Sequence, residues 1–222
     1  EVEILAGLCH ENIVRLIGFV EDLDRATAWI VLSWEPNGNL REFVASEKRE
    51  IQDTFRGLKY LHTRKPPICH GDLKSLNILV SCTYHAVITD FGSDQLTLTG
   101  PAWSLRWAAP EVVRDGEQPS LPSDIWSAGW VCWEVITGEI PFHDIKTNCA
   151  VMLQVIQGKV PSTHKNAQLA QVLRLCSLVA DCWELNPTHR PTVARCCDEI
   201  DWMVSFRIGS DRHRFGPTEE SH

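Results

Sequence analysis

The sequence predicts an α+β protein that is mainly helical, with a small strand-bearing part near its N-terminal end. Segments 13–20 and 28–33 have the composition of short strands, and the polar turn 21–25 lies between them. Further along, the stretch 125–137 is apolar all round, as expected for a helix through the middle of a large helical body. Amphipathic spacing downstream of this stretch predicts several more helices.

The first residues have helical spacing, because apolar side chains recur at Val2, Leu5, Leu8 and Cys9. After the two predicted strands, Pro36-Asn37-Gly38 breaks the chain. We expect helices over 40–44 and 50–62, with the second ending at Tyr60-Leu61-His62.

In the second half, Gly138 is expected to close the apolar helix 125–137. Amphipathic patterns predict further helices near 150–157, 169–184 and 192–205. From Phe206 onward the composition becomes polar and charged, which predicts a frayed tail.

Composition and charge exclude some classes of protein. The 222 residues are 44% hydrophobic, which allows one large domain or two small ones with a buried core. The net charge is -8 and no cluster of Lys and Arg occurs, so we expect no nucleic-acid groove. The longest apolar stretch, 125–137, contains Glu134 and is too short to cross a bilayer. With nothing that resembles a signal peptide, these features predict a soluble, intracellular protein of the cytoplasm.

The nine cysteines show no C-x-x-C pair and fall mostly inside apolar runs. This pattern lacks the spacing of a metal site or of a disulfide framework. We interpret them as buried free thiols in a reducing compartment. They are Cys9, Cys69, Cys82, Cys132, Cys149, Cys176, Cys182, Cys196 and Cys197.

The most informative stretch runs from His62 to Gly92. In it, Asp72 is followed five places on by Asn77 and then, after two short apolar runs, by Asp90-Phe91-Gly92. Three side chains suited to metal or proton chemistry therefore bracket a predicted hairpin. Any one of these pieces alone is more typical of surface turns, but together they form a specific pattern.

This stretch resembles the catalytic centre of a protein kinase. The pattern D-L-K-S-x-N at Asp72, together with Arg106-Trp107, is similar to the tyrosine-kinase-like group, which includes many Ser/Thr enzymes. The resemblance covers the chain to about Ser205 and implies a helical C-lobe with a truncated N-lobe of one helix and about two strands. It implies an N-lobe remnant and hinge over 1–35, a C-lobe over 36–205 and a disordered tail over 206–222.

The resemblance also implies catalytic roles. Asp72 would accept the proton of the substrate hydroxyl, and Asn77 and Asp90 would hold Mg²⁺ ions. Oxygen ligands suit that hard cation. Lys74 would neutralise charge on the transferred phosphate. The reaction that these residues would serve is transfer of a phosphate from ATP to Ser or Thr of a protein substrate, with ATP and Mg²⁺ as the cofactors.

The adenine pocket implied by the resemblance includes five residues. Leu32 would guard its back and Leu79 would form its floor. The backbone of Ser33-Trp34-Glu35 would be the hinge that hydrogen-bonds adenine. The chain contains neither a Gly-rich loop nor the strand Lys that would complete this pocket.

Further residues match structural positions of the family. Glu1 corresponds to the helix Glu that pairs with the strand Lys. His70 and Phe91, with Leu5 and Leu16, match four positions that stack into a spine. Each match alone is more typical of plain core packing, but they occur together in register.

Three charged residues of the second half also match structural positions of the family. Asp124 matches the Asp that anchors the catalytic loop from below. Arg190 matches the Arg that pairs with Glu111, which belongs to Ala109-Pro110-Glu111 at the end of the activation segment 93–107. Loss of one member of such a buried pair is expected to cost about 3 to 5 kcal/mol.

Two positions bear on regulation and acceptor type. Gly71 stands where many kinases have an Arg that binds a phosphorylated activation loop, so we expect no switch by phosphate on Thr97, Thr99 or Ser104. Ser104 lies where Ser/Thr kinases place a hydroxyl that touches the catalytic Asp and Lys, which favours a Ser/Thr acceptor.

Two other interpretations stay open. The chain can be a kinase-like scaffold without catalysis, because nothing in it forms a roof over adenine. Alternatively, His70-Gly71-Asp72 with Asn77 is shared by small-molecule phosphotransferases, although these lack the Ala-Pro-Glu motif and Arg190.

Overall fold

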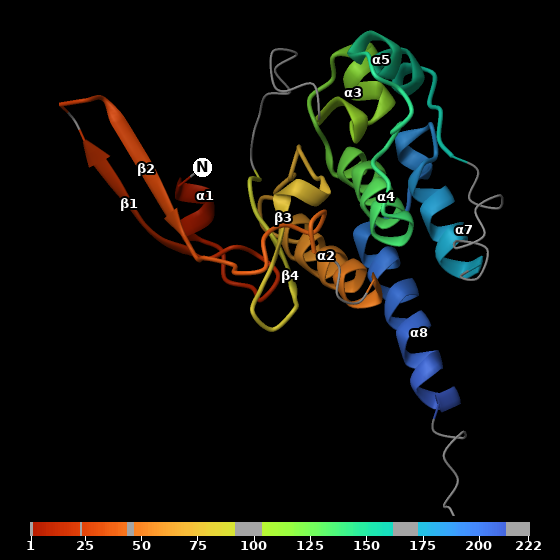
Figure 1. The fold of residues 1–222 in the computed structure, drawn as a ribbon, viewed down its shortest axis with the longest axis horizontal. Coiled ribbons are helices and arrows are strands. Elements are labelled where there is room, and N and C mark those ends of the chain that lie inside the picture. Colours follow the sequence, from red (N-terminus) through yellow and green to blue (C-terminus); the bar gives the residue numbers. More distant parts are fainter. Residues whose placement is uncertain (1, 23, 44–46, 92–103, 162–172, 212–222) are drawn as a thin grey trace, which may run out of the picture.

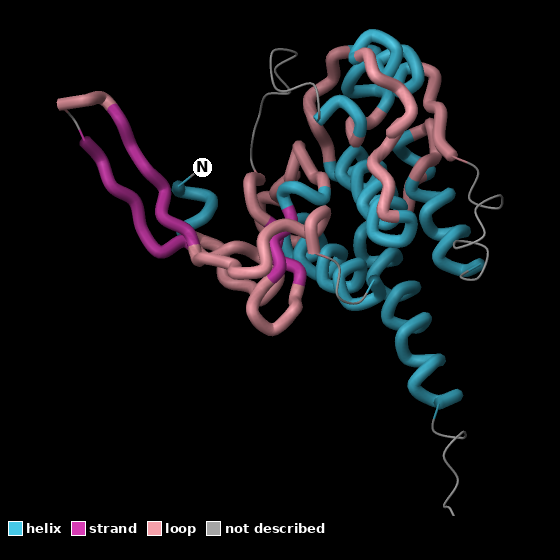
Figure 2. Tube along the Cα trace, in the orientation of Figure 1, coloured by secondary structure: helices cyan, strands magenta, loops and turns pink. Residues whose placement is uncertain are grey.

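A computed structural model gives the structure of the chain. It describes all residues except 1, 23, 44–46, 92–103, 162–172 and 212–222. The described chain is mainly helical, with two separate two-stranded sheets that lie toward the N-terminal side (Figures 1 and 2). This arrangement confirms the predicted α+β class, with one short helix and two strands ahead of the helical body.

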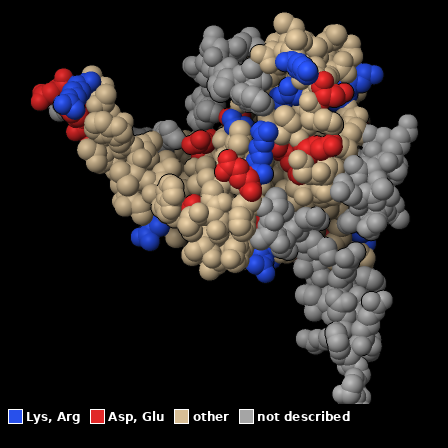
Figure 3. All heavy atoms as spheres, viewed as in Figure 1, with Lys and Arg blue, Asp and Glu red and all other residues tan. Residues whose placement is uncertain are grey.

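The N-terminal part consists of helix α1 (Val2–Ala6) and strands β1 (Leu16–Asp22) and β2 (Thr27–Leu32). The strands are antiparallel and pair from Leu16 with Leu32 to Asp22 with Thr27. They form a hairpin that projects away from the helical body, with α1 beside it (Figure 1). Charged side chains gather at its tip, where Asp22 and Arg25 form an ion pair, and its sides are largely uncharged (Figure 3). Its exposed apolar residues are Ile17, Phe19, Val20, Trp29 and Val31.

The middle of the chain builds the second sheet against a long helix. Helix α2 (Glu47–His62) is followed by the antiparallel hairpin of β3 (Ile78–Val80) and β4 (Ala86–Ile88). The α2 residues Phe55, Leu58 and Leu61 are almost fully buried. Because α2 contacts β4, α4 and α8, it joins the hairpin to the helical body.

Helix α4 (Leu121–Thr137) is the central element of the helical body. It begins with a capping box between Ser120 and Ser123 and ends at Gly138, whose φ of 73° is the left-handed conformation that glycine adopts without strain. All its residues from Ser123 to Ile136 are buried. A side chain at Gly129 would collide with the Trp183 ring, 2.7 Å from its Nε1 atom, so glycine permits this helix packing.

The remaining described helices belong to the same helical body as α4 (Figure 1). They are α3 (Pro110–Asp115), α5 (Asn148–Ile156), α7 (Leu173–Cys182) and α8 (Val193–Asp211), with single 3₁₀ turns at Ser75–Asn77, Ser104–Arg106 and Pro187–His189. Within the part of the chain that the structure describes, no helix has the length and apolar character needed to cross a bilayer.

Some local predictions are wrong. The described residues of 40–44 form a turn rather than a helix, because the Leu40 amide donates to the Ile78 carbonyl at 2.7 Å and the backbone is used to pair with β3. Helix α8 continues to Asp211, past the predicted start of the tail at Phe206. Three of the nine free cysteines, Cys9, Cys82 and Cys149, are exposed, since they lie outside the helical core.

Candidate active site

The loop that carries the predicted catalytic residues is fixed from below by helix α4. The carboxylate of Asp124 accepts hydrogen bonds from the backbone amides of His70, at 2.8 Å, and Gly71, at 2.9 Å. It also lies 2.8 Å from His62 Nε2 at the end of α2. Asp124 is only 1% exposed, so these contacts act away from bulk water, where hydrogen bonds to a charged group are strong.

Asp72, Lys74 and Asn77 lie together at the end of this loop. The Lys74 ammonium donates to Asp72 Oδ2 and, at 2.8 Å, to the hydroxyl of Ser104. The Asn77 amide nitrogen donates to the Asp72 carbonyl at 3.0 Å and to Asp72 Oδ2 at 3.3 Å. Both side-chain contacts therefore fall on Asp72 Oδ2, and Oδ1 takes part in neither. The sequence predicts that Ser104 contacts both Asp72 and Lys74, and the structure gives the contact with Lys74.

Asp90 is brought to the same place by the β3–β4 hairpin. Ile78 pairs with Ile88, and the Thr89 amide donates to the Asn77 carbonyl at 3.0 Å. Asp90 is the residue after Thr89, so the hairpin brings it near Asn77. Asp90 is exposed and has a φ of 56°, which is rare for a residue with a side chain and marks a strained position.

The donor set fits Mg²⁺. The Asn77 amide nitrogen is engaged with Asp72, so its side-chain oxygen is the atom available to a cation. The Asp90 carboxylate has no hydrogen-bond or ion-pair partner among the described residues. Over the same described ranges no group of three or more His, Cys, Asp or Glu gathers to hold a metal. One amide and one carboxylate suit Mg²⁺, which usually keeps waters and substrate phosphates as its other ligands.

His70 and Phe91 pack against each other behind the site. Their rings meet edge to face, with 6.2 Å between centroids. His70 is completely buried, and this burial lowers the pKa of its imidazole below the usual value. Leu5 is buried in the same hydrophobic core, and the partly buried Leu16 packs against that core. Glu1 lies outside the described residues.

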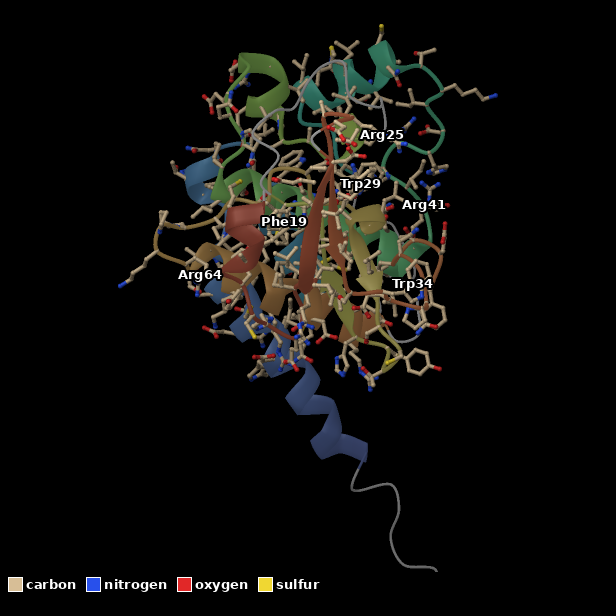
Figure 4. The ribbon with its side chains drawn as sticks, turned by 90° about the vertical axis from the view of Figure 1, so that its left-hand side faces the viewer. Phe19, Arg25, Trp29, Trp34, Arg41 and Arg64 are labelled. Atoms are coloured by element: carbon tan, nitrogen blue, oxygen red, sulfur yellow. The ribbon has the colours of Figure 1, made fainter. Side chains whose placement is uncertain are left out.

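The residues predicted to line the adenine pocket belong to strands β2 and β3 and to the segment that directly follows β2. Leu32 ends β2, and the Ser33 amide donates to the Arg15 carbonyl at 2.9 Å. Leu79 of β3 is brought to the hinge because it bridges to Asn39. The Ser33 hydroxyl donates to Glu35 at 3.0 Å. Trp34 is 86% exposed and points to the outside of the molecule (Figure 4).

Glu111 and Arg190 form a buried, two-pronged ion pair. The two guanidinium NH₂ groups (Nη1 and Nη2) of Arg190 donate to the two Glu111 oxygens at 2.6 and 2.8 Å. The Arg190 side chain is fully buried, and its guanidinium also donates to the carbonyls of Pro122 and Glu184. This pair joins α3, at the end of the segment after Ser104, to the α7–α8 connection.

Sequence reasoning missed two buried contacts of the segment 104–109. Glu134 of α4 accepts from the Ser75 hydroxyl at 2.8 Å and from Trp107 Nε1 at 2.6 Å. Burial raises the pKa of Glu134 to about 7, although both hydrogen bonds oppose this shift. Arg106 donates to the carbonyls of Pro141, Phe142 and Ile145. The available signal was a lone Glu within the apolar run 125–137.

Comparison with known proteins agrees with this geometry. A sequence model of the protein kinase domain matches residues 1–203. A light-sensor protein kinase of Ceratodon purpureus is 31% identical over 91% of the chain and 18% of its own length. The serine/threonine-protein kinase CTR1 of Arabidopsis thaliana is 31% identical over 94% of the chain and 27% of its own length. The serine/threonine-protein kinase TNNI3K of Mus musculus is 34% identical over 68% and 20%.

The chain thus spans less than a third of the length of each of these three relatives. The family match covers nearly all of the residues that the structure describes, including the loop at Asp72, the hairpin before Asp90 and the pair of Glu111 with Arg190. The resemblance found in the motifs is therefore confirmed, and the chain belongs to the protein kinase domain family.

Proposed function

We propose that the chain transfers the γ-phosphate of ATP to a Ser or Thr hydroxyl of a protein substrate. The observation that carries this proposal is the contact of one ammonium, that of Lys74, with both Asp72 and Ser104. A proton acceptor serves the attacking hydroxyl, and a positive charge beside it stabilises the γ-phosphate as it passes from ADP to that hydroxyl. Two of the three relatives described above are named serine/threonine-protein kinases, which supports the acceptor type.

In this proposal Asp72 accepts the hydroxyl proton on Oδ1. Its other oxygen is held by Lys74 and Asn77, so the carboxylate cannot rotate freely. Such fixed orientation lowers the entropic cost of reaching the transition state. Lys74 is 9% exposed, and a charge in a site with little water interacts more strongly with phosphate oxygens than a surface charge does.

Nucleotide and metal binding are assigned to residues on both sides of this centre. Leu32, Ser33 and Glu35 would contact adenine from the hinge, and Leu79 from below. Asn77 and Asp90 would hold Mg²⁺, which when bound neutralises charge on the phosphate oxygens. Within this scheme His70, Phe91 and Asp124 keep the loop in place, while Glu111 and Arg190 fix the segment that follows.

The proposal extends to the organisation and setting of the chain. Residues 1–35 would be the part of the N-lobe with the hinge, and 36–205 the C-lobe. The partners would be ATP and a protein, with no nucleic acid, and the setting would be the cytoplasm. The net charge of -8 supports the exclusion of nucleic acid.

The test is a transfer assay with ATP labelled at the γ-phosphate, Mg²⁺ and a mixed Ser/Thr-rich protein such as casein. We expect labelled phosphoserine or phosphothreonine, and a loss of about 100-fold or more in rate for Asp72→Asn. Asp115→Asn, an exposed carboxylate of α3, is the matched control and should keep the rate. Equal rates for Asp72→Asn and the native chain would contradict the proposal.

A melting experiment separates catalysis from a scaffold role. If the chain binds Mg-ATP, its melting temperature rises with ligand concentration, because the ligand stabilises only the folded state. A chain that neither gains stability with Mg-ATP nor transfers phosphate is a kinase-like scaffold, and the proposed activity is then excluded.

A further inference from the structure

Glu134 holds two parts of the candidate active site at once. Its Oε1 accepts from the Ser75 hydroxyl and its Oε2 accepts from Trp107 Nε1. Ser75 and Trp107 are each 1% exposed and Glu134 is 7% exposed, so water does not compete for these bonds. We call these three residues the Glu134 bridge. A buried carboxylate is costly unless it is hydrogen-bonded, and here both of its oxygens are engaged.

The bridge closes a ring of contacts with the catalytic loop. Ser75 directly follows Lys74 and opens the 3₁₀ turn Ser75–Asn77, which ends at the predicted metal ligand. Trp107 follows the turn Ser104–Arg106, and its amide donates to the Ser104 carbonyl at 3.2 Å. Lys74 Nζ in turn donates to the Ser104 hydroxyl. The loop and the segment therefore meet twice, once at Lys74 and once through Glu134.

Helix α4 supplies the rigid base for this ring. Ser127, two turns before Glu134 on α4, donates from its hydroxyl to the Trp107 carbonyl at 2.9 Å. Asp124, one turn earlier still, holds the loop at His70 and Gly71. One buried face of α4 thus binds the catalytic loop at two places and the segment at two places.

We propose that Glu134 is a positioning residue, whose two carboxylate oxygens set the spacing between the loop 70–77 and the segment 104–109 so that Lys74 contacts both Asp72 and Ser104. The part of this inference that concerns the phosphate-transfer step rests on the proposed function. Glu134 acts through Ser75 and Trp107 and does not itself touch the reacting groups.

The described end of the segment, residues 104–109, is held in place without a phosphate. Gly71 offers no side chain to bind a phosphorylated residue. The described end of the segment is instead held by buried internal groups, namely the Glu134 bridge, Ser127 and the three carbonyls that bind Arg106. These contacts need no modification to form.

If the bridge depends on hydrogen bonds rather than on charge, two variants of Glu134 should behave differently. One keeps the hydrogen bonds without the charge, and the other removes both. The Trp107 indole can only donate, whereas the Ser75 hydroxyl can donate or accept. Glu134→Gln therefore keeps both contacts, with its carbonyl oxygen facing Trp107 and its amide nitrogen donating to Ser75. Glu134→Met has a similar length and volume but accepts neither strong hydrogen bond, so it breaks the bridge.

The experiment measures amide hydrogen exchange in the whole 222-residue chain and, in parallel, kcat and KM for phosphate transfer. In Glu134→Met we expect exchange to accelerate by about tenfold or more in both 70–77 and 104–109, the change that follows loss of buried hydrogen bonds. We expect kcat to fall by about the same factor while KM for ATP changes by less than about threefold. Glu134→Gln should restore both quantities to near the native values.

Asp53→Asn is the matched control, because Asp53 is also a buried carboxylate, 2% exposed, but binds His85 and the Ala86 amide at the far end of the β3–β4 hairpin. It should alter exchange near 81–86 and leave 104–109 unchanged.

Three outcomes are decisive. Native exchange in both segments of Glu134→Met overturns the positioning role. So does equal acceleration in Glu134→Met and Glu134→Gln, because the role is then one of charge. If exchange responds as expected but the native chain transfers no phosphate, the coupling of loop and segment stands and the proposed function fails.

Discussion

The carboxylate of Asp124 lies 2.8 Å from the backbone nitrogen of His70, although the two residues are 54 positions apart in the sequence. This contact ties the loop at Asp72 to helix α4, which is buried from Ser123 to Ile136. Geometry at the catalytic loop therefore depends on the helical core, and stability and activity should respond together when that core contact is altered.

Asp124→Asn should reduce both stability and activity. The amide keeps one oxygen but turns an NH₂ group toward donors that require an acceptor, so at least one of the His70 and Gly71 amides loses its partner. We expect a loss of about 1 to 3 kcal/mol in the free energy of unfolding, measured by urea denaturation at pH 7. A change below about 0.5 kcal/mol would mean that these bonds contribute little to the fold.

Arg190→Met should destabilise the chain by about 3 to 5 kcal/mol, because the Glu111 carboxylate is then left buried without its partner. The double variant Arg190→Met with Glu111→Leu should recover much of this loss, since neither charge remains buried alone. Denaturation of the four proteins of this cycle gives the coupling energy. Additive losses in the double variant would contradict the account of a mutually dependent pair.

The buried Glu134 carboxyl should give stability a distinct pH dependence. Its pKa of about 7 in the folded chain lies above the ordinary 4.5 of an unfolded Glu, so between these pH values only the folded state holds the proton. Stability from this group is complete below about pH 4.5, falls as the pH rises to about 7, and is level above that. The upper limit of the change is about 3 kcal/mol.

Glu134→Gln has no titrating group at this position. Comparing it with the native chain therefore separates the titration of Glu134 from the titrations of other groups. The charged group that acts on Glu134 besides its hydrogen-bond donors is Arg41. The free energy of unfolding of Glu134→Gln, minus that of the native chain, should therefore rise from pH 5 to pH 7 and then stay constant. A difference that is flat from pH 5 to 8 would show that Glu134 is already ionised at pH 5.

Phosphate mimics in the segment should not raise activity. We expect Thr97→Glu and Thr99→Glu to leave the transfer rate unchanged or lower, because Gly71 provides no guanidinium to bind the added charge. Ser104→Glu should lower the rate, because it replaces the hydroxyl that Lys74 contacts. An increase in the rate of any of the three variants would mean that a different group binds the mimic.

Much of this architecture could be predicted from the sequence because the informative signals are local. The spacing of Asp72, Asn77 and Asp90 follows from a loop and a tight hairpin, and the apolar run 125–137 identifies the central helix. Boundaries were less predictable, since tertiary contacts set them. The pairing of residues 37–40 with β3 replaced the helix expected over 40–44.

The Glu134 bridge is a second feature that could not be predicted from the sequence. A single Glu in an apolar helix signals a buried polar group, but its partners Ser75 and Trp107 lie 59 and 27 positions away. Nothing in local spacing links these residues, because helix α4 brings them together only when the loop and the segment fold over it.

The central claim is that Asp72, Asn77 and Asp90 line one site for a metal-bound nucleotide, and paramagnetic broadening tests it most directly. Mn²⁺ replaces Mg²⁺ at such oxygen sites, so titration of the ¹⁵N-labelled chain with Mn-ADP should broaden the amide signals of Asn77, Thr89 and Asp90 first. Signals of α8, such as Cys196, should stay sharp. Uniform broadening across the chain, or none at residues 72–77 and 89–90, would contradict the claim.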